Sequence, residues 1–145
     1  MAAGAPNVLL KLSVIAPPAG VAHSLQGKDG EIVDARVSTG GTLAFEIPVR
    51  LEQGKGGWRF LGDFVRTEGK TRRFVYVGIG RHAGQTGTHW DRRAKVDLPA
   101  VTDAMIARAQ AGTLVLEGSY AGTDAKGEPA CATVKVEWSM KGAAR

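Results

Sequence analysis

Eight basic residues lie between Arg66 and Lys95, against only two acidic residues in the same window. Eight positive and two negative charges give this window a net charge of +6, whereas the whole chain carries +5 and the remainder therefore −1. A local basic surface attracts phosphate-bearing ligands, nucleic acid or an acidic partner. The alternative is a solvated basic face that only keeps the protein soluble, which would have the same number of charges. The cluster therefore indicates where an anion site would lie without establishing one.

Period-two alternation sorts part of this cluster into two faces of one expected strand. One face carries His89, Asp91, Arg93 and Lys95, and the other carries Trp90, Arg92, Ala94 and Val96. Arg92 thus shares a face with apolar neighbours, where an unpaired charge is costly. It must reach solvent, pair with a carboxylate or hold an anion. Asp63 is the carboxylate that we expect as its partner, and a pair that only fixes strand register is the alternative to ligand binding.

The stretch RFVYVGIGRHAGQTG, residues 73–87, contains Gly78-x-Gly80-x-x-Ala83-Gly84, which has the letters of a dinucleotide-binding turn. That motif works because its glycine turn delivers the pyrophosphate to the N-terminus of the helix that follows at once. Residues 81–87 make a poor helix, and the next helix is expected only near Leu98, after another strand. We therefore predict a β-hairpin here, and no cofactor.

Little in the sequence indicates a metal site or a catalytic nucleophile. The three histidines, His23, His82 and His89, match no metal-ligand spacing, so we expect three unrelated surface histidines and no metal. The one cysteine, Cys131, excludes an intramolecular disulfide. It lies near a turn with Asp124 close in sequence, and we expect an inert thiol. No serine lies in a nucleophile-elbow context.

Alternating apolar residues predict the strands that must position these groups. They are expected at 8–16, 21–26, 43–51, 58–65, 74–79, 89–96, 114–120 and 132–138, with a polar loop over 27–41. Pro48 points outward and removes a ladder donor, which predicts a sheet edge or a bulge. Residues 74–79 are apolar on both faces, as in a covered central strand. Asp97 is expected to cap a helix with Pro99 in its first turn, and Gly112 to end it.

About eight strands and one helix, at about residues 98–111, predict a mainly β fold: an antiparallel β-sandwich or a partly open barrel. A length of 145 residues suits one domain over 1–145, with short flexible tails at about 1–6 and 140–145. The apolar run at the N-terminus is interrupted by Lys11 and is too short to cross a bilayer, so we expect a strand, no membrane association and a cytoplasmic protein.

Three segments carry a family resemblance: residues 60–77, FLGDFVRTEGKTRRFVYV; residues 92–96, RRAKV; and residues 123–132, TDAKGEPACA. They resemble a family of small bacterial proteins catalogued as domain of unknown function 5990. The resemblance covers most of the chain from Val8 to Trp138 and is most specific in its last two-thirds. Thr67-Glu68 and Trp90-Asp91 depart from the family pattern. The resemblance implies a shared fold and no particular reaction.

Together these observations favour a non-enzymatic binding module for a small anionic ligand or an acidic partner. The expected ligand-binding residues are Asp63, Arg73, Tyr76, Arg92, Arg93 and Lys95, with Asp124 and Cys131 as secondary candidates. One alternative is a small hydrolase or transferase with an arginine-clamped substrate and Asp63 or Asp124 as the acid–base residue. Another is an interaction module that pairs through a sheet edge. Nucleic acid is disfavoured because aromatic residues make up only 6% of the chain, with Phe74, Tyr76 and Trp138 expected in the core. A homodimer is compatible with the sequence.

Overall fold

The computed structural model of the chain describes residues 6–69, 72–82 and 88–141, and the mainly β prediction is confirmed. The strands in these residues are β1 (Val8–Ile15), β2 (Val21–Gln26), β3 (Ile32–Val37), β4 (Leu43–Gly54), β5 (Gly57–Leu61), β6 (Arg66–Glu68), β7 (Arg72–His82), β8 (Thr88–Asp97), β9 (Leu114–Ala121), β10 (Ala132–Val134) and β11 (Ser139–Met140). A single helix among them, α1 (Asp103–Ala111), follows β8. No helix in this part of the chain is long and apolar enough to cross a membrane.

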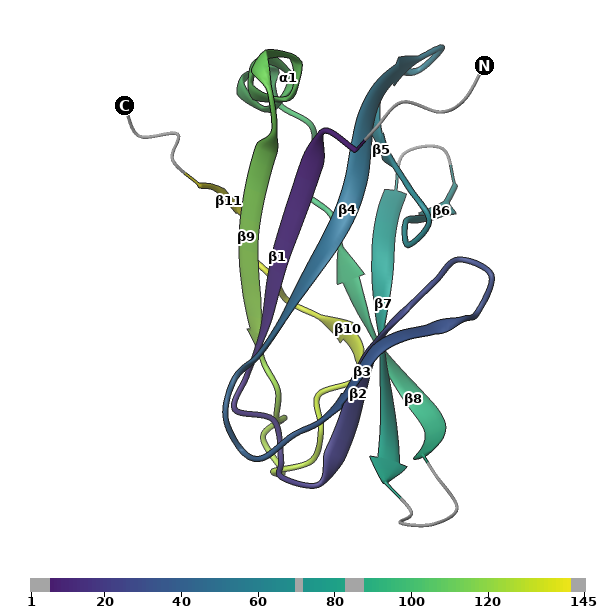
Figure 1. Ribbon diagram of the computed structural model, residues 1–145, viewed down its shortest axis with the longest axis vertical. Helices are drawn as coiled ribbons and strands as arrows, with labels where there is room; N and C mark the ends of the chain where they lie inside the picture. The colour runs from purple at the N-terminus through teal and green to yellow at the C-terminus, as the bar shows by residue number, and fades with distance from the viewer. Residues whose placement is uncertain (1–5, 70–71, 83–87, 142–145) are drawn as a thin grey trace.

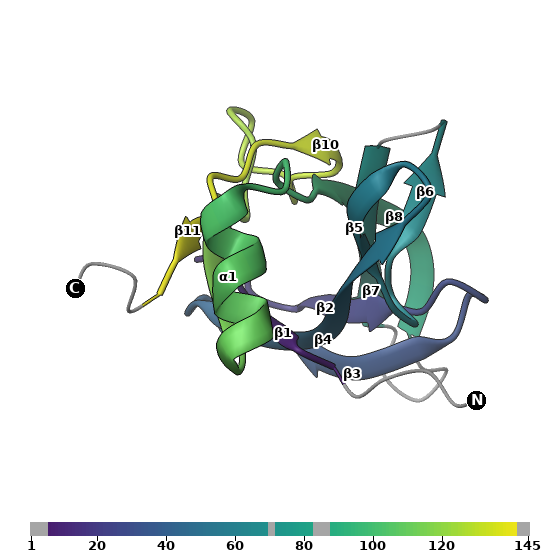
Figure 2. The ribbon, with the colours of Figure 1, turned by 90° about the horizontal axis from the view of Figure 1, so that it is seen from above.

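The strands form two sheets that enclose one interior (Figures 1 and 2). The first sheet has the order β11-β9-β1-β4-β5, and the second has the order β10-β8-β7-β2-β3, with β6 paired to β7. Two pairs, β1 with β9 and β8 with β10, are parallel, unlike the antiparallel neighbours that we expected. A parallel pair needs a long crossover connection. The route from β8 through α1 to β9 moves the chain from the second sheet to the first, which makes the parallel β1–β9 pair possible.

The core lies between the sheets because alternate residues of the long strands point inward. The inward residues of three strands are Val8, Leu10, Leu12 and Val14 of β1; Phe45, Ile47, Val49 and Leu51 of β4; and Val75, Val77 and Ile79 of β7, all buried. The predicted alternation is confirmed for β1 and β4. Central β7 pairs with β8 along one edge and with β2 and β6 along the other, as its apolar sequence predicted. Its two-sided pairing fixes which residues face the core and which face outward.

Four details of the sequence prediction are wrong or incomplete. The expected loop at 27–41 contains β3, an end strand whose residues are all exposed, so that burial leaves no alternation to detect. The helix is capped by Thr102, whose Oγ1 accepts a hydrogen bond from the Met105 amide at 3.2 Å, and not by Asp97, which ends β8. The expected final strand divides into β10 and β11, which belong to different sheets. Met140, expected in a tail, pairs with Leu116.

Pro48 lies where β4 has a free edge, because β5 pairs only with Arg50–Gly54. This accords with the predicted edge position of a residue that has no N–H group. The residues that join the predicted hairpin, 83–87, lie outside the described residues, but its two strands are present as β7 and β8. Gly78 and Gly80 belong to β7 itself, so the dinucleotide-binding motif is absent there.

Candidate functional site

Two of the predicted residues, Tyr76 and Arg93, meet on the outer face of the second sheet. Tyr76 alternates with the inward Val75 and Val77 and so points away from the core. The Arg93 Cζ atom lies 3.9 Å from the Tyr76 ring centroid, and the Arg66 Cζ atom lies 4.9 Å from the same centroid. Because Arg66 comes from β6 on one edge of β7 and Arg93 from β8 on the other, the ring lies between two guanidinium groups.

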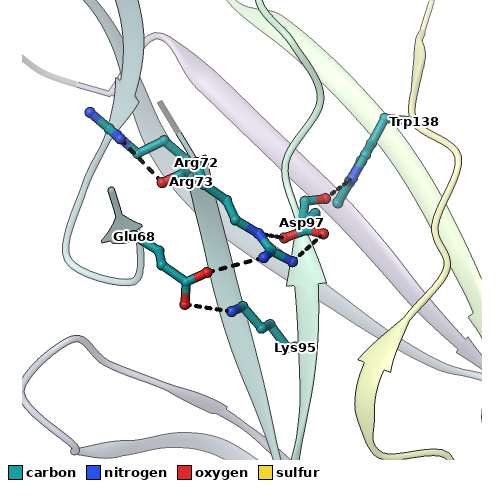
Figure 3. A network of polar contacts seen from close by, with 6 residues as sticks. All are labelled: Glu68, Arg72, Arg73, Lys95, Asp97 and Trp138. Carbon is teal, nitrogen blue, oxygen red and sulfur yellow. Dashed lines mark hydrogen bonds and ion pairs between the residues drawn. The ribbon is translucent and has the colours of Figure 1, made fainter. Parts of the chain in front are cut away.

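The third predicted residue on this face, Lys95, already has a counter-ion. Its Nζ lies 2.9 Å from Glu68 Oε2 and 4.2 Å from the centroid of the Phe74 ring. The hydrogen bond from Lys95 is the main cause that lowers the pKa of Glu68. Glu68 also accepts from Arg72 Nη1 at 3.0 Å, so one carboxylate bridges two cations (Figure 3). Lys95 is therefore less available to an anion than Arg93.

Arg72 forms a two-point pair with the last residue of β8. Its Nε and Nη2 donate to Asp97 Oδ1 and Oδ2 at 2.9 and 3.0 Å, and this pair raises the pKa of Arg72 (Figure 3). The Asp97 carbonyl accepts a hydrogen bond from Trp138 Nε1 at 2.9 Å. Both side chains of the pair are 42% exposed, so solvent screens the pair and its contribution to stability is small. Its clear consequence is that Arg72 has its charge balanced.

A pocket of about 540 Å³, which we call the end pocket, opens at the end of the interior between β5, the start of β7 and the segment from Asp97 to Val101. Its walls include Trp58, Phe60, Arg73, Leu98, Pro99 and Val101. The Leu98 amide donates to the Arg73 carbonyl at 2.9 Å, which ties the connection after β8 to the start of β7. The bond from Trp138 to Asp97 holds the same connection from the other side. The end pocket is thus a formed cavity of the size that usually binds small molecules.

Arg73 is the predicted residue that enters this pocket. It alternates with the outward Arg72 and Phe74 and shares the inward face with Val75. Its guanidinium group extends away from the Arg72–Asp97 pair (Figure 3). Nη1 donates to the Arg72 carbonyl at 3.2 Å, whereas the buried Nε has no hydrogen-bond acceptor among the described residues. Within that part of the chain Arg73 has no carboxylate partner, so its charge is uncompensated.

Arg59 also borders the end pocket but does not add a second cation to it. Its guanidinium group lies beside the β4–β5 hairpin, where Nη2 would be 2.8 Å from a Cβ atom built on Gly54. Alternation along β5 turns Trp58 and Phe60 inward and Arg59 outward, in agreement with the buried state of Phe60 and the exposed state of Arg59. Arg73 is therefore the positive group that a ligand in the pocket would meet.

The remaining primary candidates, Arg92 and Asp63, do not meet. The register shifts between Ile79 and Gly80, so that Asp91 is an extra residue in β8. This bulge places Trp90 outward, against Gly78, while Arg92 lies opposite the inward Ile79, so the face that we expected these two residues to share is wrong. The nearest carboxylate of Arg92 is that of Asp91, with Nε to Oδ1 at 4.0 Å. Asp63 is exposed in the connection between β5 and β6, and the Arg92–Asp63 pair is not formed.

The secondary candidates have structural surroundings. Asp124 Oδ1 accepts from the amides of Lys126 and Glu128 at 2.8 and 3.0 Å, which closes the predicted turn. Cys131 is an exposed free thiol directly before β10. The prediction that His23 is a surface residue is wrong, because it lies on the core face of β2 with no exposed surface. Burial lowers its pKa. In the described residues, no three His, Cys, Asp or Glu side chains lie close enough together to hold a metal ion.

Sequence reasoning missed the walls of the end pocket, Trp58 and the segment 98–101, and it missed Arg66 as a partner of Tyr76. Tyr76 was expected in the core, but it stands on the outer face between two arginines. One signal was available in the sequence. Alternation puts Arg73 on the same face of β7 as Val75 and Val77, which is the inward face, whereas Arg93 and Lys95 lie on the outward face of the sheet. The walls carry no local signal because they meet only when the two sheets pack.

Comparison with known proteins bears on the family alone. A family model described as a family of unknown function, DUF5990, matches residues 8–141. The chain belongs to this family. The resemblance seen in the three sequence segments is thereby confirmed over nearly the whole chain. Searches of the curated proteins and of the solved structures gave no significant match. The DUF5990 description assigns no activity, so function has to be argued from the geometry of the site.

Proposed function

We propose that this DUF5990 member is a binding protein for a small anion, which is held in the end pocket by Arg73. The observation that carries the proposal is the state of Arg73: an inward guanidinium group in a formed pocket, with a buried Nε that has no acceptor among the described residues. A buried donor without an acceptor is unfavourable. Such local exceptions to good packing tend to occur at binding sites. An anion that accepts from Arg73 removes this penalty.

The positions of the carboxylates around the end pocket favour a binding function over a catalytic one. In the described lining the only carboxylate is that of Asp97, and both of its oxygen atoms accept from Arg72. The hydrolase or transferase alternative needs Asp63 or Asp124 beside the bound anion, and neither residue borders the pocket in that part of the chain. An acidic protein partner on the outer face is a second candidate, supported by Arg93, which has no carboxylate partner among the described residues. Lys95 contributes less to it because Glu68 already binds its ammonium group.

Pairing through a sheet edge is less well supported. β3 ends the second sheet and exposes Ile32, Val33 and Val37 by 38, 36 and 43%. However, Asp34 has a φ of 54° and the register against β2 shifts at the same place, which marks a bulge. Bulges on end strands disrupt the ladder that a second chain would extend. We therefore prefer a small-anion site to a homodimer that pairs through this sheet edge. We also propose that the protein is cytoplasmic, which agrees with a single cysteine that forms no internal disulfide.

The proposal is tested by thermal unfolding with inorganic phosphate, acetate, succinate and benzoate, each at low and moderate salt. A ligand that binds only the folded chain raises its melting temperature by mass action. We expect at least one anion to stabilise the wild type at both salt concentrations, with the shift lost in Arg73→Met and retained in Arg59→Met. The control removes an arginine at the same pocket whose guanidinium points elsewhere. Equal shifts in the Arg73 variant and the wild type, or none in either, would contradict the proposal.

A further inference from the structure

We infer that the ligand of the end pocket is a planar aromatic carboxylate, with its carboxylate on Arg73 and its ring between Trp58 and the segment 98–101. This inference rests on the proposed function and specifies the class of anion. It follows from three features of the pocket: how many charges are uncompensated, which edge of the Arg73 guanidinium is free, and what the remaining walls are made of.

The charge count favours a monoanion. Three arginines border the end pocket, but Arg72 is paired with Asp97 and Glu68, and the Arg59 guanidinium lies over the β4–β5 hairpin. One positive charge, that of Arg73, is left to a ligand. A carboxylate balances one charge, whereas a doubly charged phosphate would keep a negative charge in a partly desolvated site. The pocket therefore favours carboxylate over phosphate.

The free edge of the guanidinium points to the same group. Arg73 uses Nη1 for the Arg72 carbonyl, so the edge formed by Nε and Nη2 has no acceptor among the described residues. Two parallel N–H groups match the two oxygen atoms of a carboxylate. Because Nε is buried, the side chain has to rotate to present this edge to the ligand. Lysine cannot reproduce the two-point geometry, so a lysine variant separates charge from geometry.

The remaining walls require an apolar body on the ligand. Trp58 and Phe60 come from β5, and Leu98, Pro99 and Val101 come from the segment between β8 and α1. Trp58 is only half-buried, so part of its ring is available for contact. Offset contact between aromatic rings is favourable beyond the area that it buries. A volume of about 540 Å³ is also more than a two-carbon acid fills. A ring placed against Trp58 uses both the apolar walls and the available volume.

The experiment titrates the full chain with four probes: benzoate, its uncharged analogue benzamide, acetate and inorganic phosphate. Binding is followed by tryptophan fluorescence and by calorimetry. Trp58 is one of three tryptophans, so the Trp58→Phe variant identifies the residue that reports binding. We expect benzoate to quench the fluorescence in a saturable way. Benzamide, acetate and phosphate should each bind with an affinity at least about tenfold lower, because each of them lacks one strong interaction. Removing a hydrogen bond to a charged group is expected to weaken benzoate roughly 10- to 150-fold in Arg73→Met. Arg73→Lys should fall between that variant and the wild type.

Circular dichroism of each variant confirms folding, and Arg59→Met should bind benzoate like the wild type. Binding of acetate or phosphate that depends on Arg73, without a preference for benzoate, would overturn the aromatic assignment and leave the proposed anion site standing. Benzoate binding of equal strength in Arg73→Met would overturn both, as would the failure of all four probes to bind the wild type. Quenching by benzoate of undiminished amplitude in Trp58→Phe would remove Trp58 from the site and also overturn the assignment.

Discussion

Replacing Arg73 by methionine should stabilise the folded chain while it removes anion binding. The change deletes the buried Nε, a donor without an acceptor among the described residues, and so recovers a penalty of about 1–3 kcal/mol. It also deletes the hydrogen bond from Nη1 to the Arg72 carbonyl, which is exposed and contributes about 0.5–1.5 kcal/mol. Methionine keeps the aliphatic contacts of the arginine stem. The net expectation is a gain of about 1 kcal/mol.

Urea denaturation at pH 7 without added anion measures this difference. For a chain of this size, 1 kcal/mol corresponds to roughly 2–4 °C in melting temperature, so a thermal scan gives an independent check. Arg59→Met is the matched control and should stay within about 0.5 kcal/mol of the wild type, as is usual for exposed positions. A decrease in the free energy of unfolding of more than about 1 kcal/mol in Arg73→Met would lie outside the expected range and would refute the predicted gain in stability. Arg73 would then be a structural residue whose Nε finds an acceptor in solution.

Three further changes test the packing and capping of the fold. Burial lowers the pKa of His23 from 6.5, so His23 of the unfolded chain takes up a proton before that of the folded chain as the pH falls. The free energy of unfolding should therefore drop by up to about 1.4 kcal/mol per pH unit below pH 6.5, until the pKa of the folded state is reached. Urea titrations from pH 7.5 to 5 should show that His23→Leu removes this slope, and an unchanged slope would contradict it. Gly118→Ala should lose about 1–3 kcal/mol in the same assay, because its Cβ would lie 2.7 Å from Val136 Cγ1, whereas Gly41→Ala meets no atom within 4 Å and should be neutral. Thr102→Ala should lose about 1 kcal/mol with the helix cap and Thr102→Ser should restore it, and equal stability of the two variants would count against the cap.

The sequence was sufficient to predict the strands that have one buried face. Alternation identified β1, β4 and β9, and the two-sided apolar run identified β7, because burial acts on every second residue or on all of them. It failed for β3, where both faces are exposed and burial leaves no pattern. It also failed at Asp91, because a single extra residue in β8 reverses the faces of the residues before it. Neither failure changed the predicted fold class.

The candidate site was only partly predictable. Basic charge pointed to the strand pair β7 and β8, and Arg73, Tyr76, Arg93 and Lys95 were named in advance. The structure nevertheless separates Arg73 from the other three, because alternation sends it to the opposite face of β7. The end pocket itself is lined by β5 of one sheet and by the segment after β8 of the other. Segments so distant in sequence meet only through sheet packing, which a single sequence does not specify.

The most direct test of the account is a ¹⁵N NMR titration that follows the arginine Nε–Hε resonances of the full chain while benzoate is added. The Arg73 resonance can be assigned by its absence from the Arg73→Met spectrum. If Arg73 binds the carboxylate, this resonance shifts downfield in a saturable way and its exchange with water slows, whereas the resonances of Arg59 and Arg93 stay in place. A shift confined to arginines on the outer face, or an Arg73 resonance that does not move at saturating benzoate, would contradict the central claim that the end pocket binds an anion through Arg73.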